Sequence, residues 1–163
     1  MLSMRSALTL SAWFLAGCFT GCKEGISPNV APVPPHVRSA AERVVVGGAT
    51  VWLETFLWRD FQPVSPPNGE PLIAILRVRT VNGAAISPTA KADSVWIING
   101  ETAWVAQVMQ EYPTADTTYL EVVARGGPKW GPGIRVDVVL RVRDGSTPPI
   151  LLRASAQPIH RTD

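Results

Sequence analysis

From Val44 onward, apolar and polar residues alternate in short runs, which is the pattern of half-buried β-strands. Segment 72–81 reads LIAILRVRTV, and its even positions up to residue 78 are expected to face a core, with two arginines in the opposite phase. Segment 134–143 reads IRVDVVLRVR and alternates in the same way. No window carries apolar residues at helical spacing over three turns. The pattern therefore predicts strands and no long helix.

Further β-rich runs surround these two segments and are separated by turn residues. The best-defined turn is Asn99-Gly100, between the runs at 95–98 and 101–105, where Asn-Gly predicts a type I′ hairpin. Asn-Gly at 82–83 and Asp-Gly at 144–145 end two other runs. The remaining strands are expected at 50–58, 117–125 and 150–154.

About seven strands in roughly 110 residues predict an all-β fold built as a single antiparallel β-sandwich, with a small open β-barrel as the alternative. Two features resemble immunoglobulin-like domains: Trp96 on the third strand, and RVDVVLRVRDG followed by ILLRA, which is similar to their final strand pair. This region has no cysteine pair, so the resemblance is closer to fibronectin-III-like sandwiches. The resemblance covers residues 44–159, implies an architecture with Trp96 in its core, and points to no particular family. We expect the domain at residues 43–159 and a C-terminal tail at 160–163.

The N-terminal end, MLSMRSALTLSAWFLAGCFTGC, has a different character. One positive charge, Arg5, precedes a mostly apolar run from Ala7 to Ala16. As a helix this run spans about 15 Å, roughly half of what a bilayer crossing requires. A removable signal peptide is therefore a better interpretation than a transmembrane helix.

The tetrapeptide Leu15-Ala16-Gly17-Cys18 is similar to the lipobox of bacterial lipoproteins. The resemblance implies that the signal peptidase recognises Leu15, Ala16 and Gly17 and removes residues 1–17. It also implies that Cys18 becomes the lipid-modified N-terminus, with diacylglycerol on its thiol and a further acyl chain on its amine. The alternative is an ordinary secretory signal that contains a cysteine.

A second box of the same kind ends at Cys22, but it begins with Phe19, which fits less well than leucine. A lipidated Cys18 has no thiol left for a disulfide, so Cys22 is expected to be a lone thiol whose role is open. In a Gram-negative cell, Phe19 after the lipidated cysteine is not the aspartate of inner-membrane retention. The resemblance then implies the periplasmic side of the outer membrane.

Residues 18–42 are predicted to form a tether between this anchor and the domain. Pro28, Pro32, Pro34 and Pro35 favour an extended, polyproline-like backbone. Fully extended, the tether would reach about 75 Å. A spacer is the main interpretation, and a proline-rich ligand motif is the alternative.

Composition and motifs exclude several classes of function. The formal net charge of +2 gives no electrostatic footprint for nucleic acid. The only histidines, His36 and His160, fall outside the expected domain, which leaves no imidazole for a catalytic triad or a zinc site. The chain has neither a phosphate-binding loop nor the carboxylate spacing of a calcium loop. We therefore expect no catalytic residue, metal or cofactor, and carboxylates that pair with cross-strand arginines; a carboxylate-dependent hydrolase is the remaining enzymatic alternative.

Two features are candidates for contact with a partner. Lys129 and Trp130 lie in GGPKWGPG, where a Gly/Pro frame presents the indole with little rotamer freedom to lose. Alternatively, Trp130 folds back to cover the open end of the domain. The second candidate is a set of arginines expected to face outward: Arg77, Arg79, Arg141 and Arg143. The alternative is that they form a solvent-exposed face and pair with acidic side chains.

Together these features favour a non-enzymatic binding or structural module of the cell envelope. It would be held at the membrane by its lipid anchor and would contact a protein or an envelope glycan. The alternative is an inhibitor or accessory subunit of a secreted or envelope enzyme, with a loop docked in the enzyme's cleft.

Overall fold

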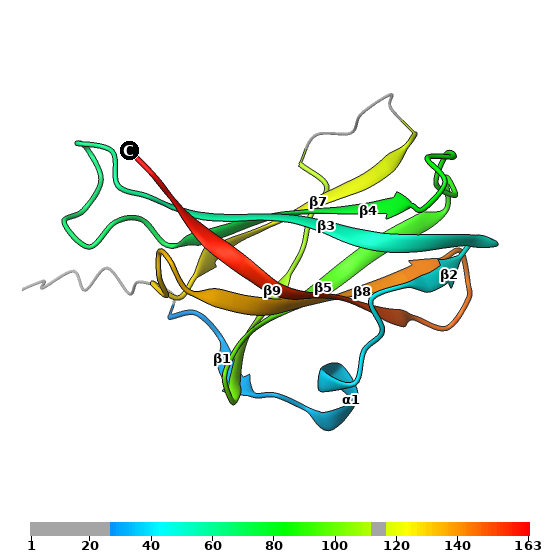
Figure 1. The fold of residues 1–163 in the computed structure, drawn as a ribbon, viewed down its shortest axis with the longest axis horizontal. Helices are drawn as coiled ribbons and strands as arrows, with labels where there is room; N and C mark the ends of the chain where they lie inside the picture. The colour runs from blue at the N-terminus through cyan, green and yellow to red at the C-terminus, as the bar shows by residue number, and fades with distance from the viewer. Residues whose placement is uncertain (1–26, 112–116) are drawn as a thin grey trace, which may run out of the picture.

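The computed structural model describes residues 27–111 and 117–163 and is all-β, with one curled sheet that forms an open half-barrel (Figure 1). The strand order is β1-β6-β5-β8-β9-β3-β4-β7, and β2 pairs with β3 beside this path. The strands are β1 (Val30–Pro32), β2 (Val44–Val46), β3 (Ala49–Asp60), β4 (Leu72–Thr80), β5 (Ala90–Asn99), β6 (Thr102–Gln107), β7 (Tyr119–Gly127), β8 (Arg135–Asp144) and β9 (Ile150–Thr162), with one short helix, α1 (Pro35–Arg38).

The all-β class is confirmed, and the half-barrel fits the small open barrel that the sequence left as the alternative. An immunoglobulin-like sandwich is not confirmed. Strand β9 joins the two halves of the sheet, because its first part pairs antiparallel with β8 and its end pairs parallel with β3. The strand changes partner near Ala156, whose φ of 55° bends the backbone. On the opposite side, the segment after β6 meets β7 at one isolated bridge, in which Met109 and Val123 exchange backbone hydrogen bonds of 3.1 and 2.8 Å.

The expected strands are present, and the hairpin at Asn99-Gly100 is confirmed as the β5–β6 turn. Its predicted type is wrong. Asn99 pairs with Thr102, so Gly100 and Glu101 are the two central residues, and only Gly100 has a positive φ, of 60°. This pattern is that of a type II′ turn, which requires glycine only at its first central position.

The main core lies inside the curl and is lined by alternate residues of the strands, including the even positions of β4. Trp104 of β6 is 2% exposed and belongs to this core. The placement of Trp96 in that core is wrong: Val95 and Ile97 point inward, so Trp96 points outward and packs against a second, smaller apolar cluster. That cluster consists of Val37, Ile98, Ala103 and Val139.

The second cluster corrects the extent of the tether. From Val30 onward the expected spacer is built into the fold, because β1 pairs with β6 and Val37 of α1 is fully buried against β5, β6 and β8. Pro35 begins α1 at a position where a missing N–H costs no hydrogen bond. Ala41 then accepts a hydrogen bond of 2.8 Å from the Arg153 N–H of β9.

The expected C-terminal tail is also part of the sheet. Strand β9 continues to Thr162, and His160 pairs with Trp58 of β3. Consequently both histidines lie on the folded domain, His36 in α1 and His160 in β9, contrary to the expectation from the sequence.

Candidate binding surface

The predicted lipidation site lies outside the described residues, as do the three residues expected to guide the signal peptidase: Leu15, Ala16, Gly17 and Cys18. In the part of the chain that the structure describes, no helix is long and apolar enough to span a bilayer.

The loop of Lys129 and Trp130 follows β7 at one end of the half-barrel. Trp130 is partly buried and packs against the main core, while Lys129 is exposed. The Trp130 N–H donates a 2.8 Å hydrogen bond to the Pro128 carbonyl. This arrangement favours the interpretation of Trp130 as a cover over the end of the core, with only part of the indole left for contact.

The candidate arginines lie on two separate parts of the sheet. Arg77 and Arg79 project from β4, whereas Arg141 and Arg143 project from β8, and β9 and β3 lie between these strands. Arg141 donates a 2.6 Å hydrogen bond to Asp93 across the β5–β8 pair, and exposed Arg143 is paired in register with Lys91. The four arginines therefore do not form one basic face.

On β4 the arginines belong to a ladder of alternating charge. Arg77 stands between Glu54 of β3 and Glu121 of β7, and donates a 2.6 Å hydrogen bond to Glu121. Arg79 donates to Glu54 at 2.6 Å, and the Tyr119 ring lies 5.2 and 4.9 Å from the two guanidinium groups. The hydrogen bond from Arg77 to Glu121 is the largest cause of a raised Arg77 pKa. The expected pairing of carboxylates with outward arginines is confirmed here.

Beside this ladder, β3 carries an aromatic surface that the sequence reasoning missed. Trp52 is 38% exposed and Phe56 is 46% exposed, although both stand on a central strand. The Phe56 ring lies 5.2 Å from the Trp58 ring and 5.3 Å from the His160 ring, which is nearly parallel to it. We call these four residues the aromatic face: Trp52, Phe56, Trp58 and His160.

A hollow of about 290 Å³ adjoins the aromatic face and is lined by residues of β3 and β4. Phe56 and Ile75 supply its apolar part, and Glu54 and Arg77 supply charge at its edge. A signal for this surface was present in the sequence: in segment 50–58 the aromatic residues occupy the phase opposite to the buried Leu53 and Leu57. Aromatic and arginine side chains in one patch are typical of binding surfaces.

Arg59 is a second residue whose role was missed. It is 1% exposed, and its guanidinium donates to the backbone carbonyls of Glu70 at 2.9 Å and of Asn68. It also donates to the carbonyls of Lys129 at 3.1 Å and Gly131 at 2.8 Å. Burial lowers the Arg59 pKa, but a guanidinium keeps its proton at neutral pH. The Arg59 guanidinium thus connects two loops. A signal for its burial was present in the sequence, because Arg59 shares the phase of the inward-facing residues of β3.

The described residues hold no group of three or more histidine, cysteine or acidic side chains placed to bind a metal ion. His160 stands on the aromatic face, where its ring contact is with Phe56. The carboxylates that carry hydrogen bonds mostly accept them from arginines.

Comparison with protein-family models, with curated proteins and with solved structures gave no match to this chain.

Proposed function

We propose that this chain is a lipid-anchored, non-enzymatic binding module of the cell envelope, and that it contacts a protein or glycan partner through the aromatic face. The observation that carries the proposal is the exposure of Trp52 and Phe56 beside the ladder of Glu54 and Arg77. Large apolar side chains exposed together on one sheet face are uncommon in the absence of a partner. The anchor rests on the lipobox-like sequence ending at Cys18.

The test is capture from solubilised envelopes by the full chain, compared with a Trp52→Ala/Phe56→Ala double variant. Both rings are partly in water already, so we expect the double variant to stay folded and to lose at least tenfold in capture. Val81→Ala is the matched control, because Val81 is 50% exposed in the turn just after β4 and lies outside the aromatic face. Equal capture by the double variant would contradict the proposal. Parallel binding assays on purified envelope glycan and on envelope protein identify which partner is bound.

A second candidate function, an inhibitor or accessory subunit, is favoured by the loop between β3 and β4, residues 61–71. Its tip residue Val64 is 92% exposed, although the base of the loop is held by Arg59. The Ser65 N–H donates to Gln62 at 2.8 Å and the Gly69 N–H to Pro66 at 2.7 Å, which gives the loop internal order. A loop ordered before binding loses little entropy when it docks in a cleft.

Val64→Asp tests this second candidate. We expect the variant to keep the thermal midpoint of the wild type and to lose co-purification with a secreted or envelope hydrolase. The double variant of the aromatic face should retain that co-purification. Co-purification unaffected by Val64→Asp would remove the candidate.

A further inference from the structure

The sheet contains a gap between β3 and β9 that is bounded at both ends. The edge of β3 that faces away from β4 pairs with β2 as far as Val51. From Leu57 onward the same edge pairs with β9. Between these two points, no described strand pairs with this side of β3. At the end of the opening nearer β2, the boundary is formed by the residues between Ala41, which pairs with β9, and Val44, which pairs with β3. We call this opening the β3–β9 window.

The pairing register shows which backbone groups face the window. Val81 donates its N–H to Thr50, so Thr50 and the even-numbered residues that follow it exchange hydrogen bonds with β4. The backbone N–H and C=O groups of the odd-numbered residues point away from β4. The N–H and C=O groups of Leu53 and Thr55 therefore point into the window, where they have no strand partner. Such groups are a template for pairing with another chain.

A hollow of about 370 Å³ opens at the window, which is large enough for a short peptide segment. Residues 52–55 of β3, among them Trp52 of the aromatic face, line one side. Ser155 and Gln157 line the other side, and Glu42 and Arg43 stand at the end nearer β2. The Thr55 hydroxyl donates to the Gln157 side-chain oxygen at 2.6 Å, which joins the two strands at the opposite end.

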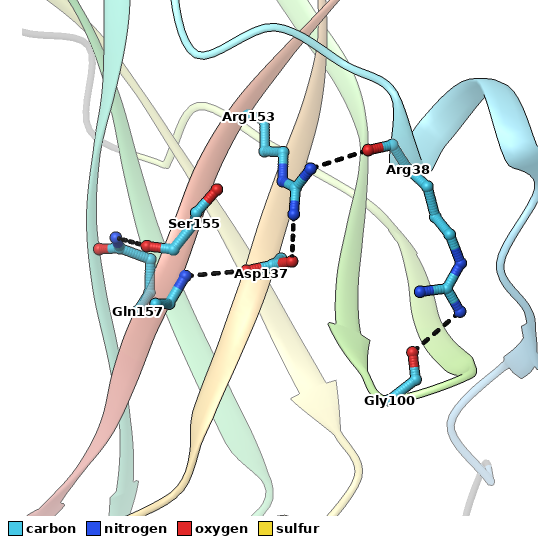
Figure 2. Close-up of polar contacts among 7 residues, drawn as sticks. Arg38, Gly100, Asp137, Arg153, Ser155 and Gln157 are labelled. Atoms are coloured by element: carbon cyan, nitrogen blue, oxygen red, sulfur yellow. Dashed lines mark hydrogen bonds and ion pairs between the residues drawn. The ribbon is translucent and has the colours of Figure 1, made fainter.

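The β9 side of the window is held by a polar network (Figure 2). Arg153 donates to Asp137 at 2.5 Å and to the Arg38 carbonyl at 2.8 Å. Asp137 also accepts the Ala156 N–H at 2.8 Å, which stabilises the residue with positive φ. Gln157 donates to the Ser155 carbonyl at 2.7 Å. The β9 side of the window is therefore ordered before a ligand binds, which favours binding.

We infer that the β3–β9 window binds a short extended peptide of a partner protein by strand addition. A peptide backbone presents donors and acceptors at the strand repeat, which matches the unpaired groups of Leu53 and Thr55. Glycans and lipid headgroups have no such repeat. Because β3 and β9 run parallel, a guest between them is antiparallel to both or parallel to both, and antiparallel pairing is the more stable. Trp52 of the aromatic face also lines the window hollow, so the two sites are adjacent. The inference goes beyond the proposed function and does not involve Phe56, Trp58 or His160.

Hydrogen exchange of the full chain in detergent tests the window without any ligand. The amides of Trp52, Glu54 and Phe56 are paired with β4 and should exchange slowly. The amides of Leu53 and Thr55 should exchange at least tenfold faster. Uniformly slow exchange along this part of β3 would overturn the inference, because the window would then be closed.

Selection of random linear heptapeptides displayed on phage tests the ligand class. Synthetic peptides from the selection should bind the wild type and slow the exchange of the Leu53 and Thr55 amides. Ser155→Trp, which fills the window, should weaken their binding at least tenfold. Ser146→Trp is the matched control, since Ser146 is exposed in the β8–β9 turn, and it should bind like the wild type.

Two further outcomes would overturn the inference. One is a selection that yields no peptide with these properties. The other is a set of peptides whose binding survives Ser155→Trp and is lost in Phe56→Ala, because Phe56 belongs to the aromatic face and does not line the window hollow. Loss of envelope capture in Phe56→Ala, with window binding intact, would separate the two sites.

Discussion

At the scale of single residues, Arg59 has the most consequential position. A buried cation usually has a carboxylate partner, but here the guanidinium donates to four backbone carbonyls from two loops. The Phe61 ring lies 5.0 Å from the guanidinium and adds a cation–π contact. Because both loops depend on one side chain, substitution of Arg59 changes the loop that bears Val64 and the loop that bears Trp130 together.

Arg59→Leu should lower the free energy of unfolding by about 3 kcal/mol or more, because four buried carbonyls lose a charged donor. Arg59→Lys should be almost as damaging, since an ammonium group cannot reproduce the planar fork of donors. Urea unfolding measures both effects. Arg143→Leu, on the exposed face of β8, should change stability by no more than about 0.5 kcal/mol. A wild-type urea midpoint for Arg59→Leu would contradict this account.

At the scale of elements, the segment from β1 to β2 determines how far the domain stands from a membrane. Only eleven residues separate Cys18 from Val30, where β1 begins. If Cys18 is lipidated, this length reaches at most about 40 Å, instead of the ~75 Å expected of a tether that extends to residue 42. On the outer side of the sheet, Val37 covers Ile98 of β5, Ala103 of β6 and Val139 of β8.

Val37→Ala should lower the free energy of unfolding by about 2 kcal/mol, because it leaves a cavity in the second cluster. Val45→Ala is the matched control: Val45 is 58% exposed on β2, and its truncation should have an effect below about 0.5 kcal/mol. Equal effects of the two substitutions would show that α1 does not pack as described.

The β5–β8 pair should also respond to acid. Burial by itself would raise the Asp93 pKa, but hydrogen bonds from Arg141 and Ser94 and the nearby charges of Arg141 and Arg143 bring it below the ordinary 3.8. A carboxyl whose pKa is depressed by folding stabilises the fold above the unfolded-state pKa, and this contribution disappears as the pH falls through the folded-state pKa. Asp93→Asn should therefore be less stable than the wild type at pH 7, with the difference shrinking below pH ~3.8. Urea titrations across this range measure it, and a difference independent of pH would refute the assignment.

At the scale of the whole molecule, the proposed anchor and the binding surfaces are separate features. The half-barrel presents the aromatic face and the β3–β9 window on the outer side of β3, whereas the chain enters the fold at β1, at the other end of the strand order. A partner can therefore be bound without contact between β1 and the site.

Cys18→Ala should leave an unprocessed precursor that takes up no labelled palmitate and remains in the inner-membrane fraction. Cys22→Ala is the matched control and should be processed and labelled as the wild type is. If Cys18→Ala is processed normally and Cys22→Ala is not, the second box is the one used. If both are processed without label, the signal is an ordinary secretory one.

Local pattern was sufficient for most strands. In β4 and β8 a two-residue period decides which side chains are buried, and this period is visible in the chain itself. The same logic predicted that Arg77 would find carboxylates across the strands. It did not identify the turn type at Gly100, because Asn99-Gly100 is compatible with more than one register of a two-residue turn.

What the chain could not reveal were features that depend on distant segments. Trp96 and Trp104 look equivalent in sequence. The register of the β5–β6 pair sets Trp104 opposite inward-facing Ile97, so Trp104 lies in the main core and Trp96 on the outer side, against the cluster of Val37. The β3–β9 window likewise exists because β9 changes partners at Ala156, a long-range pairing that leaves no mark in local periodicity. Alternation along a strand therefore determined the class of fold, while the order of the strands, and with it every candidate binding surface, was decided by tertiary contacts.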